Sequence, residues 1–217
     1  MKTSLLRIAT LLCLCSSFAF AQRIEISPLV SYPRWSRKAL GSLNETNNKD
    51  TDTQLRGKMG YGVRLTWNTK GYYGHEIGYI LNTADFRTDI ATTSADGKTV
   101  TRARKTSEVK IQQAFYNFMI YMMPAGERIR PFITGGAQAY QYGAPKIAEY
   151  SRGTQRTYGA NFGGGVKFKL MEHLNVRLDF RDYIGGTPYD LKYADDTKFG
   201  GGMFQQLEGS VGISITF

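Results

Sequence analysis

Apolar and polar side chains alternate in the final segment of the chain, residues 207–217. A repeat of two residues places successive side chains on opposite faces of a β-strand, so the pattern predicts a strand. In a soluble sandwich the apolar face would line the core, so the alternation alone does not say which way that face points. The apolar positions are Leu207, Val211, Ile213, Ile215 and Phe217, and the intervening ones are Glu208, Ser210, Gly212, Ser214 and Thr216.

Seven earlier segments also show strand character. Two of them are less regular than the others. Pro28 cannot donate a hydrogen bond to a β-ladder, so we expect an irregular first strand, and the fourth segment is apolar on both faces. The eight predicted strands are residues 23–32, 59–68, 72–85, 109–123, 131–142, 157–170, 174–183 and 204–217.

The connections between these strands are alternately long and short. Long polar segments occupy residues 33–58, 86–108, 143–156 and 184–203, and short turns occupy residues 68–71, 124–126 and 171–173. Short periplasmic turns and longer extracellular loops are typical of membrane barrels. We therefore predict an all-β fold, an eight-stranded antiparallel up-and-down transmembrane β-barrel, with apolar faces toward lipid. An open sheet whose charges face solvent is the alternative.

Residues 1–21 have the composition of a secretory signal peptide. Lys2 and Arg7 provide a positive start, an apolar stretch follows, and the segment ends in Ala-Phe-Ala. We expect cleavage after this tripeptide. The remaining residues 22–217, about 196 in number, are enough for one domain, the predicted outer-membrane barrel.

Both cysteines of the chain, Cys13 and Cys15, lie inside the predicted signal peptide. A lipoprotein signal is therefore the alternative, although each cysteine follows a leucine and a lipidated cysteine normally follows a small residue. If both cysteines leave with the signal, the exported protein has no disulfide.

The formal net charge is +10, and +8 remains without Lys2 and Arg7. A basic balance can indicate nucleic-acid binding, but an exported chain meets little nucleic acid, so we expect no such partner. Anionic lipid head groups and lipopolysaccharide phosphates are the expected neighbours. No later window holds the roughly 18 apolar residues of a spanning helix, whereas spanning strands of about 9 to 11 residues escape that criterion.

Charged residues occur on the polar faces of the predicted strands. Turned inward, these side chains would have to pair with opposite charges on neighbouring strands, because single buried charges are costly. An eight-stranded lumen is just wide enough for side chains to fill it, so we expect a closed, ion-paired interior. The residues are Glu25, Arg64, Glu76, Lys167, Arg177, Asp179, Arg181 and Glu208. The strand register is hidden by the loops, so no individual pairs are predicted.

Aromatic residues gather near the ends of the predicted strands. Amphipathic rings favour the head-group level of a bilayer, so we expect two aromatic girdles; the alternative is the general frequency of tyrosine in β-proteins. The residues are Tyr32, Trp35, Trp67, Tyr72, Tyr73, Tyr121, Tyr140, Tyr142, Tyr158, Tyr183 and Phe217.

The sequence offers little for catalysis or cofactor binding. Its two histidines, His75 and His173, lie in or next to predicted turns, where a histidine is usually a solvated surface group. There is no GxSxG, HExxH, phosphate-binding loop or cysteine metal site. The acidic run at residues 47–52 lacks the glycine and the final glutamate of a calcium loop. We expect no enzyme activity, no metal and no cofactor.

The late segments GGAQAY, YGANFGGGVKFKLMEHLNVRLDFRDYIGG and LEGSVGISITF resemble the outer-membrane β-barrel family of Gram-negative bacteria, whose small members are similar to the barrel domain of outer-membrane protein A. The resemblance covers residues 131–217 well and the first half only by topology. It rests on Gly163, Gly164, Gly165, Lys167, Arg177, Asp179, Arg181 and Phe217. It implies an outer-membrane location and insertion by the barrel-assembly machinery, with Phe217 ending the assembly signal in the terminal strand. It implies no activity, and no peptidoglycan-binding domain is recognised.

We therefore expect a monomeric, non-enzymatic outer-membrane barrel with a structural or surface-interaction role that its extracellular loops carry out. A narrow channel for small solutes and a secreted soluble barrel that binds a small apolar ligand are the alternatives. Basic residues in the loops are the expected contacts with lipopolysaccharide phosphates. They are Arg34, Arg37, Lys38, Arg102, Arg104, Lys105, Arg152 and Arg156.

Overall fold

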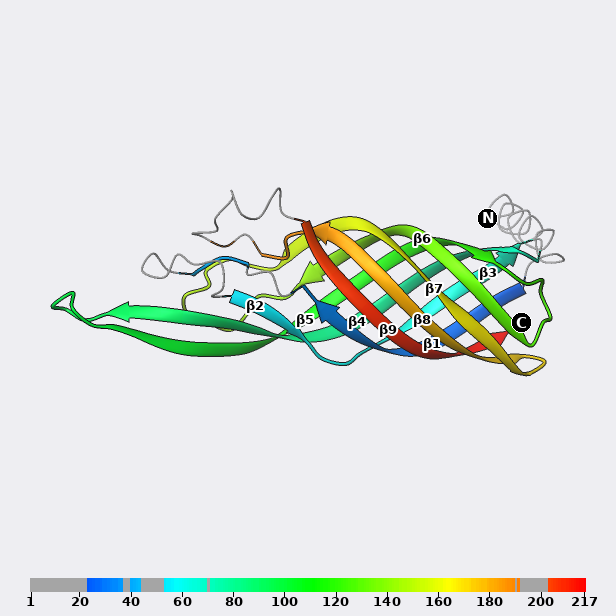
Figure 1. Ribbon diagram of the computed structural model, residues 1–217, viewed down its shortest axis with the longest axis horizontal. Helices are drawn as coiled ribbons and strands as arrows, with labels where there is room; N and C mark the ends of the chain where they lie inside the picture. Colours follow the sequence, from blue (N-terminus) through cyan, green and yellow to red (C-terminus); the bar gives the residue numbers. More distant parts are fainter. Residues whose placement is uncertain (1–22, 37–39, 44–52, 70, 190, 192–202) are drawn as a thin grey trace, which may run out of the picture.

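The computed structural model describes residues 23–36, 40–43, 53–69, 71–189, 191 and 203–217. The predicted signal peptide therefore lies outside the described residues. The elements are nine strands in one antiparallel sheet (Figure 1). They are β1 (Arg23–Trp35), β2 (Thr53–Gly57), β3 (Gly60–Thr69), β4 (Tyr73–Thr93), β5 (Val100–Tyr121), β6 (Ile129–Tyr142), β7 (Gln155–Met171), β8 (Leu174–Gly186) and β9 (Met203–Thr216). The described residues include no helix long and apolar enough to span a membrane.

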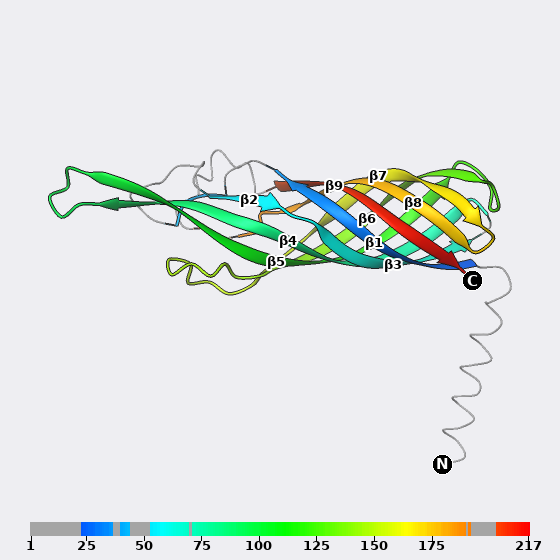
Figure 2. The same cartoon turned by 90° about the horizontal axis from the view of Figure 1, so that it is seen from below.

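Eight of these strands close into a ring. Neighbouring strands pair in the order β4-β3-β1-β9-β8-β7-β6-β5, and pairing of β5 with β4 completes the circle. The predicted eight-stranded antiparallel barrel is thus confirmed. Figure 2 shows that the C-terminus and the β4–β5 hairpin lie at opposite ends of the molecule. We call these the C-terminal end and the hairpin end.

The ninth strand, β2, lies within the segment 33–58 that was predicted to be a loop. It pairs with residues 84–88 of β4, beyond the point where β3 stops pairing. Only Lys58 and Met59 separate it from β3, so β2 continues the line of β3 along the same neighbour. A strand of five residues is too short for its alternation to be recognised inside a polar segment.

The prediction of a loop at residues 86–108 is wrong. β4 and β5 continue through it as a paired hairpin that projects well beyond the other strands (Figure 1). Asp96 and Gly97 form its turn, and Gly97 has φ +71°, a conformation that glycine adopts without strain. The Arg104 side chain donates to the Asp89 carboxylate directly opposite, with Nε to Oδ1 at 2.8 Å. Because β-branched threonines also favour strands, this polar segment extends the sheet into solvent.

Pro28 interrupts one ladder without shifting its register. On one side it pairs with Val63 of β3, whereas the pairing with β9 is absent at Ser27 and Pro28 and resumes at Leu29 in the same register. The Ser27 and Ser214 hydroxyls bridge the interruption at 2.6 Å. The expected irregularity is therefore local.

The apolar faces point outward, as predicted. In β9, Val211, Ile213 and Ile215 are about half exposed, whereas Ser210 and Ser214 are buried inside the barrel. The outward side chains of β1 change from Ile24, Ile26 and Val30 to Tyr32 and then Arg34. The stretch from Ile24 to Tyr32 is nine residues long, which fits the roughly 9 to 11 residues of a membrane-spanning strand.

The undecided faces of residues 109–123 are resolved by packing. Tyr116, Phe118 and Ile120 face outward, whereas Phe115, Met119 and Tyr121 are buried inside. The Phe115 ring lies over Gly78, its partner across the β4–β5 ladder, and a Cβ at Gly78 would enter that ring. The missing side chain at Gly78 therefore makes room for the Phe115 ring in the lumen, where it packs with Leu29 and Ile80.

This contact gives a first testable prediction. Replacing Gly78 with leucine should destabilise the barrel by about 1 to 3 kcal/mol, because the extra carbons must displace the Phe115 ring from a filled interior. Urea titration of the protein refolded into lipid vesicles measures the loss. The double variant Gly78→Leu/Phe115→Ala should recover part of it, and a double variant no more stable than the single one would contradict the proposed clash.

Candidate functional site

The barrel interior holds a layer of charged side chains from six strands. All eight residues predicted to face the lumen are buried there: Glu25, Arg64, Glu76, Lys167, Arg177, Asp179, Arg181 and Glu208. They divide into a central network, a pair near the C-terminal end, and Glu208. The structure places no ion pair on Glu208 among the described residues; its Oε2 accepts from Gln206 at 3.0 Å.

The central network joins three arginines to two carboxylates. Asp179 accepts from Arg64 Nη1 at 2.7 Å, from Arg177 Nε at 2.9 Å and from Arg181 Nη2 at 2.9 Å. Glu76 accepts from Arg177 Nη1 at 2.5 Å and from Arg181 Nη2 at 2.7 Å. Every member is buried, so each ionised group replaces its lost hydration with charge-assisted hydrogen bonds.

Local sequence and strand register together build this network. Arg177, Asp179 and Arg181 occur at every second residue of β8, and the period of a strand turns all three inward. On the neighbouring strand β7, Gly163 lies opposite Arg181, and a Cβ there would collide with the arginine. Gly163 thus lets the backbones of β7 and β8 approach closely beside the network.

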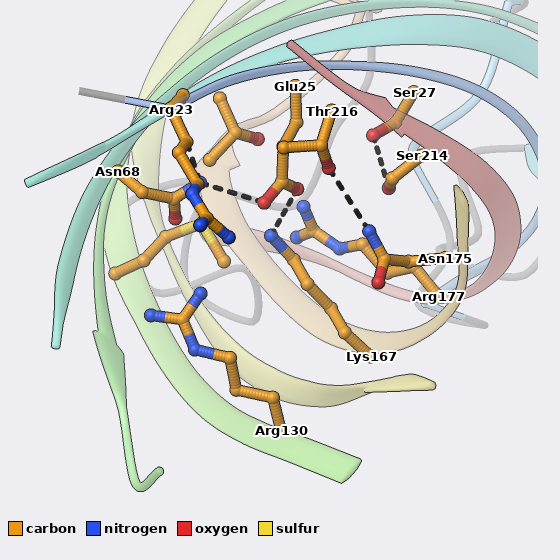
Figure 3. A network of polar contacts seen from close by, with 12 residues as sticks. Arg23, Glu25, Ser27, Asn68, Arg130, Lys167, Asn175, Arg177, Ser214 and Thr216 are labelled. Carbon is orange, nitrogen blue, oxygen red and sulfur yellow. Dashed lines mark hydrogen bonds and ion pairs between the residues drawn. The ribbon is translucent and has the colours of Figure 1, made fainter. Parts of the chain in front are cut away.

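A second cluster lies nearer the C-terminal end. Figure 3 shows Glu25 and Lys167 pointing toward each other inside the barrel, with Lys167 Nζ 2.5 Å from Glu25 Oε2. Asn68 donates to the other carboxylate oxygen at 2.7 Å, and Lys167 also donates to the Tyr121 hydroxyl at 2.8 Å. The Arg130 guanidinium lies 3.4 Å from the centre of the Tyr121 ring. A cavity of about 50 Å³ adjoins this cluster, which is room for one or two water molecules.

An aromatic layer fills the interior toward the hairpin end, and sequence reasoning missed it. Five residues assigned to the aromatic girdles are buried here or inside the barrel, so that assignment is wrong for them: Trp35, Tyr121, Tyr140, Tyr142 and Tyr183. The Trp35 ring contacts Tyr140, Tyr142 and Phe204 at centroid separations of 5.9 Å. Segments outside the ring also contribute, since Tyr150 and Tyr189 pack on Phe86 of β4. Trp35 lies an even number of residues after Glu25 in β1, so both side chains point inward. This spacing was the signal in the sequence that could have predicted the burial of Trp35.

The other six predicted girdle aromatics lie on the outside of the barrel or at its rim. They are Tyr32, Trp67, Tyr72, Tyr73, Tyr158 and Phe217. At the C-terminal end, Trp67 stacks on His75 at 5.3 Å, and His75 Nδ1 lies 2.7 Å from the Tyr116 hydroxyl. His75 thus belongs to an outward aromatic patch.

The described basic residues predicted to contact lipopolysaccharide are exposed at the hairpin end. Arg34, Arg102, Arg104, Lys105, Arg152 and Arg156 are exposed, whereas Arg37 and Lys38 lie outside the described residues. Two of them form surface ion pairs: Arg104 with Asp89 and, at 2.5 Å, Lys105 with Glu149. These hydrogen bonds lower the pKa of Asp89 and of Glu149. A lowered carboxyl pKa means that each pair contributes above the ordinary carboxyl pKa and is lost as the pH falls.

The two histidines and the possible metal ligands were the chemistry to look for in the described part of the chain. No group of three or more potential metal ligands occurs among the described residues. His173 lies in the β7–β8 turn, with Nδ1 3.0 Å from the Thr216 carbonyl oxygen. Neither histidine is hydrogen-bonded to a serine or carboxylate in the described structure.

Comparison with known proteins identifies the architecture. Residues 8–212 match the family model described as outer membrane protein beta-barrel domain. The outer membrane protein OprG from Pseudomonas aeruginosa is similar in structure, with TM-score 0.52, 12% identity, and coverage of 91% of this chain and 96% of that one. The N-terminal β-barrel domain of Pseudomonas aeruginosa OprF gives TM-score 0.50 and 12% identity over 89% and 97% of the two chains. At 12% sequence identity, the structural similarity to these two proteins shows a shared fold and nothing about function. No curated protein sequence matches the chain.

Proposed function

Because this chain belongs to the outer membrane protein β-barrel domain family, whose location is the outer membrane, we propose that it is a non-enzymatic integral barrel whose hairpin end is a surface for anionic lipid. The single observation that carries this proposal is the distribution of charge. Three interior carboxylates, Glu25, Glu76 and Asp179, are paired with arginines or a lysine inside the barrel, whereas exposed cations gather outside at the hairpin end.

The packing of the interior favours a closed barrel over a solute channel. The central network and the aromatic layer are stacked along the same lumen, from residues of strands on all sides of the ring. An eight-stranded barrel has room for little more than its own side chains. Steady single-channel currents in planar bilayers would contradict a closed interior.

We further propose that the chain is exported by cleavage of residues 1–21, that the barrel-assembly machinery inserts it through β9 and Phe217, and that it acts as a monomer without a nucleic-acid partner. The exposed Phe217 at the C-terminal end is accessible to such a machinery. With Phe217 and the three short turns at the periplasmic side, the hairpin end faces the cell exterior.

The lipid-binding surface can be tested on the folded protein. Replacing Arg102, Arg104, Lys105, Arg152 and Arg156 with glutamine should weaken binding of lipopolysaccharide at least tenfold at low salt, because each cation near an anionic surface contributes about 1 kcal/mol. Binding to the unmodified protein should also fall as salt is added. Titration of the protein in neutral micelles with purified lipopolysaccharide measures both effects.

The matched control neutralises cations at the opposite end. Arg23→Gln, Arg128→Gln and Lys169→Gln change charge at the C-terminal end and should leave the affinity unchanged. Equal binding by the five-residue variant and the unmodified protein would remove the proposal.

A further inference from the structure

A groove of about 540 Å³ opens in the barrel wall at the hairpin end, between β1 and β2. Its origin is the sheet topology. β1 pairs with β3 only as far as Ser31 and Gly60, after which β1 continues along β9 and β2 continues along β4. The described residues show no β-ladder between β1 and β2, although Gly57 of β2 lies close to the Pro33 carbonyl of β1, so the groove marks a break in the hydrogen-bonded wall.

Three arginines stand on the outward face of this groove. Arg34 of β1, Arg56 of β2 and Arg87 of β4 line it together with Tyr32 and Gln54. Among the described residues, no carboxylate pairs with Arg34 or Arg56. Arg87 reaches Asp85 only at 3.4 Å, and Asp85 is already held by Lys58 at 2.7 Å. The groove therefore has excess positive charge.

The floor of the groove is aromatic and contains a buried donor without a partner. Trp35 is 4% exposed and lines the groove, yet its indole Nε1 has no hydrogen-bond acceptor among the described residues. The neighbouring Cδ1 of the indole faces β2, since a Cβ built on Gly57 would lie 3.2 Å from it. Arg87 Nε is likewise buried and unpaired within the described structure. Unpaired buried donors are unfavourable. Because both atoms are covered, the two side chains must shift for an acceptor oxygen in the groove to reach them.

The position of the groove selects the class of ligand. Tyr32 ends the apolar outward face of β1 and Arg34 follows it, so the groove lies where the lipid-facing wall meets the aqueous exterior. A ligand there presents its phosphate to the arginines and its apolar part to the outward face of β1 that Tyr32 ends, while Pro33, Leu55 and the Trp35 ring form the floor of the groove. We propose that the groove binds the phosphate group of an outer-leaflet lipid. This inference rests on the proposed function and assigns it one site, to which Arg56, Arg87 and Trp35 contribute.

The two tryptophans of the chain allow a direct test. Trp35 lines the groove and Trp67 lies at the C-terminal end, so the Trp67→Phe variant reports the groove alone. In neutral micelles, dihexanoyl phosphatidic acid should produce a saturable change in Trp35 emission, and added salt should weaken it. Dihexanoyl phosphatidylcholine, whose phosphate is balanced by choline, should produce no saturable change in the same range.

Charge removal distinguishes specific binding from partitioning into the micelle. Arg34→Gln/Arg56→Gln, in the same reporter background, should weaken phosphatidic acid binding at least tenfold. Arg34→Lys/Arg56→Lys, which keeps the charge, should retain more of the affinity than the glutamine pair. The matched control Arg102→Gln/Arg156→Gln should bind as the reporter protein does. Unboiled gels that show the heat-modifiable band confirm that each variant is folded.

Three results would overturn the assignment. Phosphatidylcholine could bind as well as phosphatidic acid, the glutamine pair could bind as the reporter protein does, or inorganic phosphate could saturate the signal at the same concentration, which would make the site one for a free anion. The proposal for the groove and the proposal for the wider cationic surface are tested by different variants. The five-residue variant above leaves Arg34, Arg56 and Arg87 intact, and the glutamine pair leaves the other cations intact.

Discussion

Replacing Asp179 with alanine should lower the free energy of unfolding by about 3 to 5 kcal/mol, the cost of removing one partner from a buried ion-paired network. The carboxylate accepts hydrogen bonds from Arg64, Arg177 and Arg181, and all four side chains are buried. Without it, Glu76 still pairs with Arg177 and Arg181, whereas Arg64 loses its ion pair and keeps the hydrogen bond to Ser210. Urea titration of the protein refolded into lipid vesicles, followed by tryptophan fluorescence, measures the change.

The control for this prediction is an Asp–Arg ion pair on the surface of the protein. Asp89 binds Arg104 on the solvent-exposed hairpin, and Asp89→Ala should cost no more than about 1 kcal/mol, because exposed ion pairs are screened by water. If Asp179→Ala were as mild as Asp89→Ala, the central arginines would not depend on this carboxylate, and the network would not stabilise the closed barrel.

A lysine at Leu178 should destabilise the barrel by about 2 to 4 kcal/mol. Leu178 points outward in the middle of the apolar stretch of β8, directly opposite Val211 of β9, and both side chains are exposed on the barrel wall. A cation at this depth loses its hydration to acyl chains. The same urea titration in vesicles of defined lipid thickness measures the loss, and thinner bilayers should reduce it.

The control for Leu178→Lys is the same new residue outside the apolar band. Gln205 also faces outward but lies toward the hairpin end of β9, so Gln205→Lys should change stability by less than about 1 kcal/mol. Equal losses at the two positions would mean that Leu178 does not face hydrocarbon.

The alternation of side chains was enough to predict most of the barrel. Most strands of the wall have an apolar outward face and small or polar residues on much of the inward face, and this two-residue period is a local property of the chain. β5 is the exception, with Phe115, Met119 and Tyr121 inside. The eight inward charges followed from the same period. The aromatic assignment was wrong for five residues. For Trp35, Tyr140, Tyr142 and Tyr183 the position near a strand end was used, although all four share parity with inward residues of their strands; Tyr121 lies on the strand whose faces the sequence left undecided.

The β4–β5 hairpin shows a second limit of prediction from the sequence. Residues 86–108 are mostly polar, and only Phe86 and Ile90 give one face an apolar alternation, which is too short to predict a strand. The segment pairs in register because β4 and β5 already lie side by side in the barrel wall. The Asp96-Gly97 turn was the readable signal. Pairing that starts in the barrel wall extends outward at little additional entropic cost, because the two strands are already held together there.

The sequence by itself determined that this is an all-β chain with charged residues on one face of its strands and lipid-compatible residues on the other, because both properties repeat every two residues. Only the tertiary structure decided which charges meet, since Glu76 and Arg177 lie 101 residues apart and their pairing depends on strand register around the closed ring. The pairing of strands around the ring also placed Trp35 of β1 at the floor of the groove beside β2. That groove exists because two strands follow different neighbours, which no local pattern of side chains encodes.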